Sequence, residues 1–324
     1  MLTISADDVD RALTFPDLVE TLRAAFRAGA IQPVRHHHTV ERPTGAASTL
    51  LLMPAWTDFS RADASGDGYI GVKVVTVSPD NNAIGKPAVM GVYLLLDGIT
   101  GEPRALIDGQ RLTQWRTASA SALAADYLAR KDASKLLVVG AGAMGQFLAR
   151  AHSAVRPIRE ILIWNRTPAN AERLAAQLSG EGHPATAVED LDAALGWADI
   201  VSAATISTNP LIKGVLLKPG THVDLVGAFT PSMRESDDET IRRARIYVDT
   251  RAGATKEAGD IVQPLASGLL KPEGIVADLH ELARGEKAGR ENAEEITLFK
   301  SVGAALEDLA AGVAVYRAVA ETGT

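Results

Sequence analysis

Hydrophobic and polar residues follow two patterns along this chain, one typical of helices and the other of strands. Phe15–Ala28 places Leu18, Leu22 and Phe26 on one side at helical spacing, which predicts an amphipathic helix. Ser5, with Asp7 and Asp8 in the turn that follows, predicts the N-cap of an earlier helix. The chain therefore opens with helical structure.

The first third of the chain then becomes rich in strands. We expect strands at Thr49–Met53, Tyr69–Val77, Val89–Leu96 and Pro103–Ile107. Pro54 predicts the end of the first of these, and Gly98–Gly101 predicts a hairpin turn between the last two. Hairpins rather than βαβ units organise this region.

Beyond Arg111 the pattern changes to alternating helices and strands. Thr113–Leu128 predicts a long alanine-rich helix, and strands follow at 136–139, 160–164, 199–203, 222–226 and 246–248. Ile296–Ala320 predicts a last helix. Its apolar face is Leu298, Val302, Leu306, Leu309 and Val313. Such alternation is typical of a parallel sheet with helices on both faces.

We therefore expect an α/β protein of two domains. A strand-rich α+β domain spans residues 1–112, and a Rossmann-type, doubly wound parallel sheet spans residues 113–299. A C-terminal helix over 300–324 packs back on the first domain.

The strongest local motif is the stretch from Lys135 to Gly145. A short apolar strand leads into Gly140, Gly142 and Gly145, spaced as G-x-G-x-x-G, and a helix-like run follows. The first glycine allows a tight turn, the second lets the backbone approach a pyrophosphate, and the third lets helix and strand pack closely. The helix N-terminus offers N–H groups to the anion. We expect a dinucleotide at Gly140, Gly142, Ala143, Met144 and Gly145.

The residues after the second strand of this unit indicate which dinucleotide binds. A carboxylate there would accept hydrogen bonds from the ribose 2′-hydroxyl and repel a 2′-phosphate. This chain has Asn165, Arg166 and Thr167 instead, so a guanidinium and a hydroxyl are available to a phosphate. We expect NADPH to be preferred, with NADH possible.

Composition narrows the class of protein. The net charge of −7 over 324 residues argues against nucleic-acid binding, and the absence of cysteine removes disulfides and zinc–thiolate sites. No membrane-spanning run and no signal peptide are visible, so we expect a cytoplasmic enzyme. His36–His38 alternate faces on an extended chain, and Asp63–Gly68 lacks the last ligand of a calcium loop and predicts a hairpin tip. We expect no metal site.

Three basic residues of the first part are candidates for chemistry. Lys73 interrupts an apolar strand, where it is either on a polar face or a buried charge with a partner. Arg116 and Thr117 lie early in a helix, and Arg35 lies on a loop after a proline. Together they would bind a small carboxylate, whereas each arginine alone is typical of a solvated surface.

Several short segments, taken together, resemble one known family over about residues 1 to 315. These are Gln32–Arg35, Gly71–Lys73, Arg116–Thr117, Gly140–Gly145, Trp164–Thr167 and Phe299–Gly303. They are similar to the ornithine cyclodeaminase/μ-crystallin family. The resemblance implies a homodimer whose first domain carries the dimer sheet and much of the substrate pocket. It also implies that Arg35, Lys73 and Arg116 hold the substrate carboxylate. Further cofactor contacts are expected at Arg116, Thr117, Asn165, Arg166, Thr167, Thr205, Val226, Gly227 and Ser301.

One departure from the family pattern bears on the reaction. Phe229 stands where cyclodeaminases carry a catalytic aspartate, and the surrounding segment resembles the family's cyclic-imine reductases. The expected reaction is therefore NAD(P)H-dependent reduction of Δ1-pyrroline-2-carboxylate or Δ1-piperideine-2-carboxylate to L-proline or L-pipecolate. Phe229 would line the substrate site, and Lys73 would join the carboxylate clamp or act as general acid. The alternatives are an alanine dehydrogenase-like enzyme, an ornithine cyclodeaminase and a non-catalytic NADPH-dependent ligand-binding protein.

Overall fold

The computed structural model describes residues 1–60 and 68–322 and divides the chain into two compact units. The first unit comprises Met1–Arg116 and Ala305–Thr324, and the second comprises Thr117–Ala304. The sequence pattern places these boundaries at residues 112 and 299. Most of the expected hairpin tip, residues 63–67, lies outside the described residues.

The first unit contains a mixed six-stranded sheet in the order β1-β6-β5-β4-β3-β2. The strands are β1 (Leu2–Ile4), β2 (His36–Val40), β3 (Ser48–Trp56), β4 (Tyr69–Val77), β5 (Val89–Asp97) and β6 (Pro103–Asp108). Strands β2 to β6 pair antiparallel, and β1 joins the edge parallel to β6. The expected strand-rich domain built on hairpins is confirmed.

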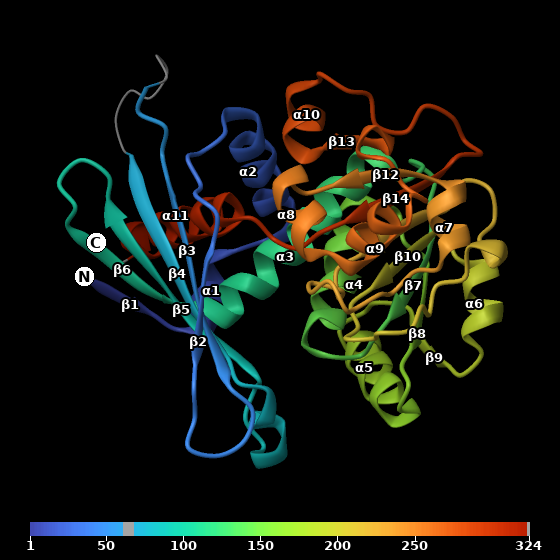
Figure 1. Ribbon diagram of the computed structural model, residues 1–324, viewed down its shortest axis with the longest axis horizontal. Coiled ribbons are helices and arrows are strands. Elements are labelled where there is room, and N and C mark those ends of the chain that lie inside the picture. The colour runs from blue at the N-terminus through green and yellow to red at the C-terminus, as the bar shows by residue number, and fades with distance from the viewer. Residues whose placement is uncertain (61–67, 323–324) are drawn as a thin grey trace. The chain divides into compact units, whose positions relative to one another are not determined.

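Helices α1 (Ala6–Ala12), α2 (Phe15–Ala28) and α11 (Ala305–Thr322) belong to the first unit, and α11 lies along the sheet (Figure 1). Ser5 and Thr14 cap the first two helices, so the expected N-cap at Ser5 is confirmed. A Cβ on Gly71 of β4 would lie 3.2 Å from Leu309 of α11. The helix therefore packs closely on the face of the sheet to which alternate residues such as Lys73 and Tyr93 point.

The expected end of β3 at Pro54 is wrong, because the strand continues to Trp56. Trp56 exchanges two backbone hydrogen bonds with Ile31. The backbone nitrogen of Pro54, two residues earlier, points to the same edge of the strand as that of Trp56. The chain between Ile31 and β2 forms no ladder with β3 at this point. Pro54 therefore lacks an N–H where no ladder hydrogen bond is required.

The second unit is built on an eight-stranded, entirely parallel sheet in the order β13-β12-β14-β11-β10-β7-β8-β9. The strands are β7 (Lys135–Val139), β8 (Glu160–Trp164), β9 (Ala185–Val188), β10 (Ile200–Ala203), β11 (His222–Leu225), β12 (Ala244–Val248), β13 (Ile275–Asp278) and β14 (Ile296–Lys300). The strand order reverses between β7 and β10, the point where α/β sheets of this kind bind ligands. The expected doubly wound parallel sheet is confirmed.

Helices connect these strands (Figure 1). They are α4 (Ala143–Val155), α5 (Pro168–Gly180), α6 (Leu191–Trp197), α7 (Asp238–Arg243), α8 (Arg251–Glu257), α9 (Gly259–Ser267) and α10 (Leu279–Arg284). Helix α3 (Gly109–Leu128) begins in the first unit, four residues before the predicted start at Thr113, and continues into the second. Among the described residues, no helix is both long and apolar enough to cross a membrane.

The expected helix from Ile296 is wrong at its beginning, because Ile296–Lys300 forms strand β14. This strand lies between β11 and β12, and all five of its residues are buried. A strand buried on both faces of a parallel sheet shows a continuous apolar run, which a helix can show equally well. The helix itself begins at Ala305.

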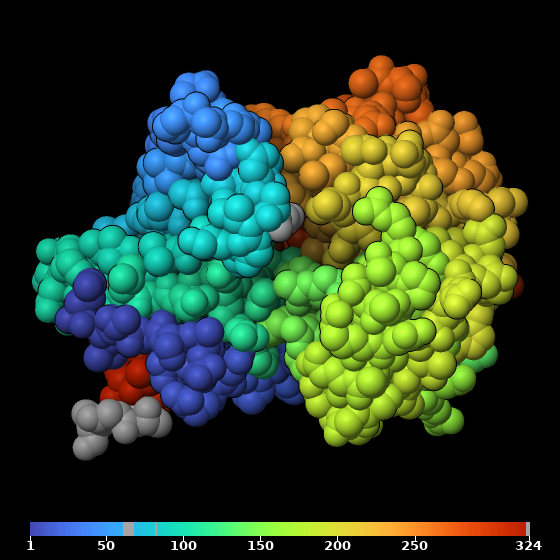
Figure 2. Space-filling model, turned by 90° about the horizontal axis from the view of Figure 1, so that it is seen from below, coloured from blue at the N-terminus to red at the C-terminus, as the bar shows by residue number. Residues whose placement is uncertain are grey.

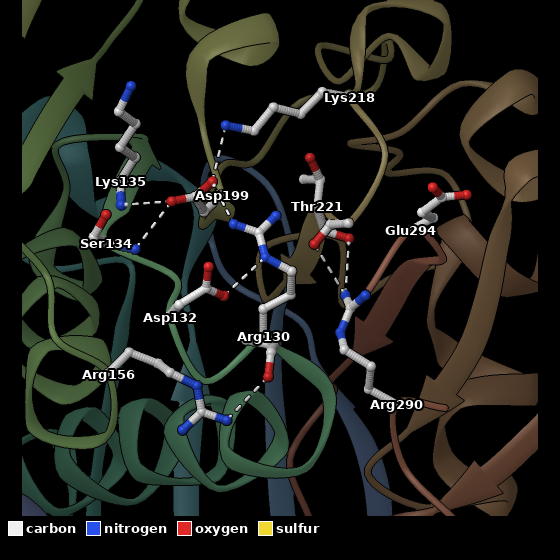
Figure 3. Close-up of polar contacts among 12 residues, drawn as sticks. Arg130, Asp132, Ser134, Lys135, Arg156, Asp199, Lys218, Thr221, Arg290 and Glu294 are labelled. Atoms are coloured by element: carbon white, nitrogen blue, oxygen red, sulfur yellow. Dashed lines mark hydrogen bonds and ion pairs between the residues drawn. The ribbon is translucent and has the colours of Figure 1, made fainter. Parts of the chain in front are cut away.

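A polar cluster links the chain segments at the amino ends of the parallel strands (Figure 3). Asp199 accepts hydrogen bonds from the backbone of Ser134 and Lys135, at 3.0 and 3.1 Å, and pairs with Arg130 and Lys218. Arg290 donates to backbone oxygens that include those of Leu128 and Gly220. Because ligands of such sheets bind at the opposite, carboxyl edge, we interpret this cluster as structural.

Candidate functional site

Buried charges gather in the first unit, where β4, α3 and α11 meet. The Lys73 ammonium lies 2.8 Å from the Asp308 carboxylate. The Arg116 guanidinium lies 3.0 Å from Asp308 and 2.7 Å from Glu307. Lys73 and Arg116 are only 3% and 5% exposed. Of the two readings of Lys73, the structure therefore supports a buried charge with a partner.

Burial and neighbouring charges shift the protonation of this cluster. The pKa of Lys73 is lowered to about 8, first by burial and then by Arg116, against the opposing effect of Asp308. Burial alone would raise the pKa of Asp308, but Arg116 and Lys73 outweigh it and hold that pKa below its usual value. Lys73 is thereby able to exchange a proton near neutral pH.

Arg35 adds a third positive charge to the cluster. Its charge lowers the pKa of both Lys73 and Asp308, so its guanidinium lies within their electrostatic reach. Lys73 and Arg116 thus contact the carboxylates of Glu307 and Asp308, and Arg35 adds its charge nearby. Arginine and lysine side chains gathered in this way are suited to bind a small carboxylate.

Glu307 and Asp308 are site residues that the sequence reasoning missed. Acidic residues at the start of a helix are commonly explained by the helix dipole, and α11 begins only two residues before Glu307. A signal was nevertheless present, because a lysine inside an apolar strand requires a buried carboxylate somewhere in the chain. Tyr93 lies close by, and its buried hydroxyl has no hydrogen-bond partner among the described residues.

In the second unit, the glycine-rich loop after β7 has the geometry of a phosphate-binding turn. Gly140 has a positive φ of 111°, and a Cβ there would lie 2.7 Å from the Ala204 carbonyl oxygen. A Cβ on Gly145 would lie 2.6 Å from the Gly140 oxygen, whereas one on Gly142 would meet nothing within 4 Å. The side of the loop at Gly142 is therefore open to a ligand.

Helix α4 begins at this loop without a side-chain cap. Its N-cap is Gly142, and the exposed Ala143 and the half-buried Met144 form its first turn. Uncapped N–H groups at a helix N-terminus attract anions. The loop and the helix are therefore suited to hold a pyrophosphate.

The three residues after β8 have different surroundings. Asn165 accepts a hydrogen bond from the Ala141 N–H at 3.0 Å and donates to the Thr167 carbonyl oxygen, so its amide joins the two loops. Arg166 and Thr167 are exposed, and Thr167 caps α5 without a side-chain hydrogen bond. Figure 2 shows this yellow-green part of the chain on the surface of the unit. Arg166 and Thr167 are thus accessible to a phosphate.

The remaining predicted residues lie at the carboxyl ends of the strands or on α3. Thr205 follows β10, Val226 and Gly227 follow β11, and Thr117 is buried on α3. Ser301 follows β14 and is buried, with its hydroxyl 3.3 Å from Asp249. Phe229, beyond β11, is 41% exposed. The structure brings Thr205 and Gly227 together, because both hydrogen-bond to Glu235, another residue that the sequence reasoning missed.

Comparisons with known proteins show the family to which the chain belongs. Residues 2–323 match the family model described as the ornithine cyclodeaminase/mu-crystallin family. The chain is 39% identical to Δ1-pyrroline-2-carboxylate reductase of Paracoccus denitrificans, with 94% of this chain and 93% of that protein covered.

Solved structures show the same similarity. The Thermococcus litoralis Δ1-pyrroline-2-carboxylate reductase in complex with NADH and L-proline is similar with a TM-score of 0.92 and 35% identity. The match covers 100% of this chain and 99% of that one. An archaeal alanine dehydrogenase dimer with bound NAD is similar with a TM-score of 0.89 and 29% identity, over 100% and 97% of the two chains. This chain therefore belongs to the ornithine cyclodeaminase/mu-crystallin family.

Proposed function

We propose that this chain, an NAD(P)-dependent oxidoreductase of its family, reduces a cyclic imine whose C=N carbon carries a carboxylate. The substrate is Δ1-pyrroline-2-carboxylate or its six-membered homologue, and the product is L-proline or L-pipecolate. The observation that carries the proposal is the buried cluster of Lys73, Arg116, Glu307 and Asp308, with Arg35 in electrostatic reach of Lys73. The reductases named above, which resemble the chain over nearly its full length, support the same reaction.

The cluster has two tasks in this reaction. Arg35 and Arg116 bind the substrate carboxylate and thereby fix the orientation of the ring. Lys73 donates a proton from its Nζ to the imine nitrogen, for which a pKa near 8 is suitable. Protonation matters because an iminium carbon accepts hydride far more readily than the carbon of a neutral imine. The dinucleotide supplies that hydride when bound.

Phe229 distinguishes this proposal from ornithine cyclisation. A phenyl ring accepts no proton and offers no charge to a substrate ammonium group. At the position where the family's cyclodeaminases carry an aspartate, it suits an apolar ring without a side-chain amine.

For the cofactor, we propose NADPH as the preferred form, with NADH also used. No carboxylate stands after β8, and the exposed Arg166 and Thr167 are available to a 2′-phosphate at the N-terminus of α5. Similar structures hold NADH or NAD, so turnover with NADH is part of the proposal.

We further propose that the chain acts as a homodimer through the open face of the first sheet. Many of the side chains that point away from α11 are apolar, and they include Leu52, Pro54, Trp56, Ile70, Val72, Val74, Val92, Leu94, Leu96 and Leu106. Such a continuous apolar face requires a partner in water, and a second copy of the same face is complementary to it. A similar alanine dehydrogenase is described as a dimer.

The proposed reaction is tested by following NADPH and NADH oxidation with the two cyclic imines and with pyruvate plus ammonia. Ammonia release is measured separately with ornithine, because cyclodeamination causes no net oxidation of the dinucleotide. We expect Δ1-pyrroline-2-carboxylate or Δ1-piperideine-2-carboxylate to give a kcat/KM at least about a hundredfold above pyruvate with ammonia, since the latter lacks a preformed C=N. Faster turnover of pyruvate with ammonia would instead indicate an amino-acid dehydrogenase. Release of ammonia from ornithine at a higher rate would indicate a cyclodeaminase, and tight ligand binding without any turnover would indicate a binding protein.

The same assay tests the cofactor proposal with the variant Arg166→Ala. Loss of a charged hydrogen bond to the 2′-phosphate should raise the KM for NADPH about 10- to 100-fold and leave the KM for NADH nearly unchanged. Equal effects on both cofactors would contradict the role given to Arg166.

A further inference from the structure

Four hydrogen-bond donors from two separate loops converge on the buried carboxylate of Glu235. One of its oxygens accepts from the backbone N–H and the hydroxyl of Thr205, at 2.6 and 2.9 Å. The other accepts from the backbone N–H groups of Gly227 and Ala228, at 2.7 and 3.2 Å. The side chain thus joins the loop after β10 to the loop after β11.

The two loops lie where this type of sheet binds its ligand. Both loops follow the carboxyl ends of neighbouring strands, β10 and β11. These strands lie on one side of the point where the strand order reverses, and β8 and β9 lie on the other. In dinucleotide-binding sheets the adenosine occupies the first half and the nicotinamide the second. A Cβ on Gly227 would lie 1.9 Å from the Thr205 carbonyl oxygen, so the two loops are in direct contact.

Charged groups from two further elements face Glu235. The Lys300 ammonium, at the end of β14, lies 3.9 Å from Glu235 and 3.7 Å from Asp260 of α9. It forms no hydrogen bond within the described part of the chain. One oxygen of Asp260 accepts from the backbone N–H groups of Glu235 and Ser236 and from the Ser236 hydroxyl. Asp260 therefore fixes the backbone that carries Glu235, and Lys300 compensates both carboxylates.

We propose that Glu235 is a positioning residue that holds the loops after β10 and β11 in the conformation that binds the nicotinamide half of the cofactor. Lys300 favours the ionised form of this carboxylate, which is the form that four donors require. This inference rests on the cofactor class of the proposed function, but it does not depend on which imine is reduced.

The protonation of Glu235 provides a readout that packing alone would not affect. Burial raises the pKa of Glu235 to about 7, with Asp260 acting in the same direction and Lys300 against it. Protonation converts one acceptor oxygen into a hydroxyl facing N–H groups, which weakens the attachment of the loops. Loop order and cofactor affinity should therefore decline together as the pH falls below about 7.

The first experiment measures hydrogen exchange of the cofactor-free chain in peptides that cover residues 204–207 and 226–229. Corrected for intrinsic rates, protection in the wild-type chain should be at least about tenfold higher at pH 8 than at pH 5.5. Glu235→Gln should remove this protection at both pH values, because an amide NH₂ cannot accept from N–H groups. Glu281→Gln is the matched control. Glu281 likewise accepts a hydrogen bond from a backbone N–H, that of Asp278, and it pairs with Arg251 rather than with these loops.

The second experiment measures NADH and NADPH dissociation constants from pH 5.5 to 8.5 by fluorescence. Glu235→Gln should bind both about 10- to 100-fold more weakly and lose the pH dependence, whereas Glu281→Gln should retain both properties. Lys300→Met should move the midpoint of the wild-type profile by about one pH unit toward higher pH, because Glu235 then loses its positive neighbour.

The outcomes separate this inference from the proposed function. Wild-type protection and affinity in Glu235→Gln would overturn the inference, as would pH-independent loop exchange in the wild-type chain. This second result needs no variant and therefore applies even where Glu235→Gln does not fold. Cofactor binding with the expected Glu235 dependence but no imine turnover would overturn the proposed substrate alone. A wild-type chain that binds neither dinucleotide would overturn both.

Discussion

Lys73 shows how one residue acquires a role from partners distant in sequence. A buried ammonium is unfavourable unless carboxylates compensate it, and Asp308 lies 235 positions further along the chain. Because Asp308 also binds Arg116, the three side chains fix one another's positions. A lysine held in this way has few alternative conformations and a pKa close to physiological pH.

We expect the reductase activity to depend on the ammonium form of Lys73. Since deprotonation occurs as the pH rises through the pKa, kcat/KM should fall above about pH 8 in the wild-type enzyme. Lys73→Met should lower kcat/KM about 10²- to 10⁴-fold and abolish this limb. The measurement is a pH profile with Δ1-pyrroline-2-carboxylate.

Asp308→Asn provides the complementary test. Asp308 raises the pKa of Lys73, so its neutralisation should move the falling limb to lower pH. Circular dichroism must accompany the profile, because breaking a buried ion pair costs about 3–5 kcal/mol of unfolding free energy. A falling limb that stays at the same pH in a folded variant would exclude Lys73 as the titrating group.

At the scale of single elements, the three glycines after β7 are needed for different reasons. Gly140 and Gly145 are required by backbone conformation and by close packing, whereas Gly142 has ordinary dihedral angles and open space beside it. An alanine at Gly142 would therefore be tolerated by the fold but would occupy the side of the loop that a phosphate approaches.

We predict that two alanine substitutions in this loop affect different properties, one cofactor affinity and the other stability. Gly142→Ala should raise the dissociation constant of the cofactor at least about tenfold, or about 1.4 kcal/mol, with little change in thermal stability. Gly145→Ala should lower the free energy of unfolding by about 1–3 kcal/mol, because its Cβ would lie 2.6 Å from the Gly140 oxygen. Calorimetric titration and thermal unfolding distinguish the two. A Gly142→Ala variant with wild-type affinity would contradict the phosphate role of the loop.

At the scale of the whole molecule, the open face of the first sheet carries the proposed dimer interface. Leu52, Val74 and Val92 form a cross-strand row near its middle, and Val92 is 41% exposed. A row of aliphatic side chains of this kind contacts water unless another surface covers it.

Val74→Asp should convert the proposed homodimer into a monomer. The charge would enter the symmetric interface from both copies, so the dimer dissociation constant should rise at least about a hundredfold. Sedimentation equilibrium at micromolar concentration measures this change. The control is Ile99→Asp, because Ile99 is an equally apolar residue that is 72% exposed at the turn between β5 and β6. A dimer that survives Val74→Asp would place the interface elsewhere.

The sequence by itself determined the elements whose signals are local. The amphipathic helix Phe15–Ala28, the strand Tyr69–Val77 and the glycine turn after β7 could all be predicted, because side-chain periodicity and backbone freedom act over a few residues. The family, and with it the general fold, followed from several such motifs in order.

Only the tertiary structure decided which distant residues meet. It makes Ile296–Lys300 a strand, because this run lies between two others in a sheet buried on both faces. It lets β3 pass through Pro54, pairs Lys73 with Asp308, and joins Thr205 to Gly227 through Glu235. The physical reason is that burial, charge compensation and ladder hydrogen bonds depend on neighbours in space, and a linear pattern of residues does not contain them.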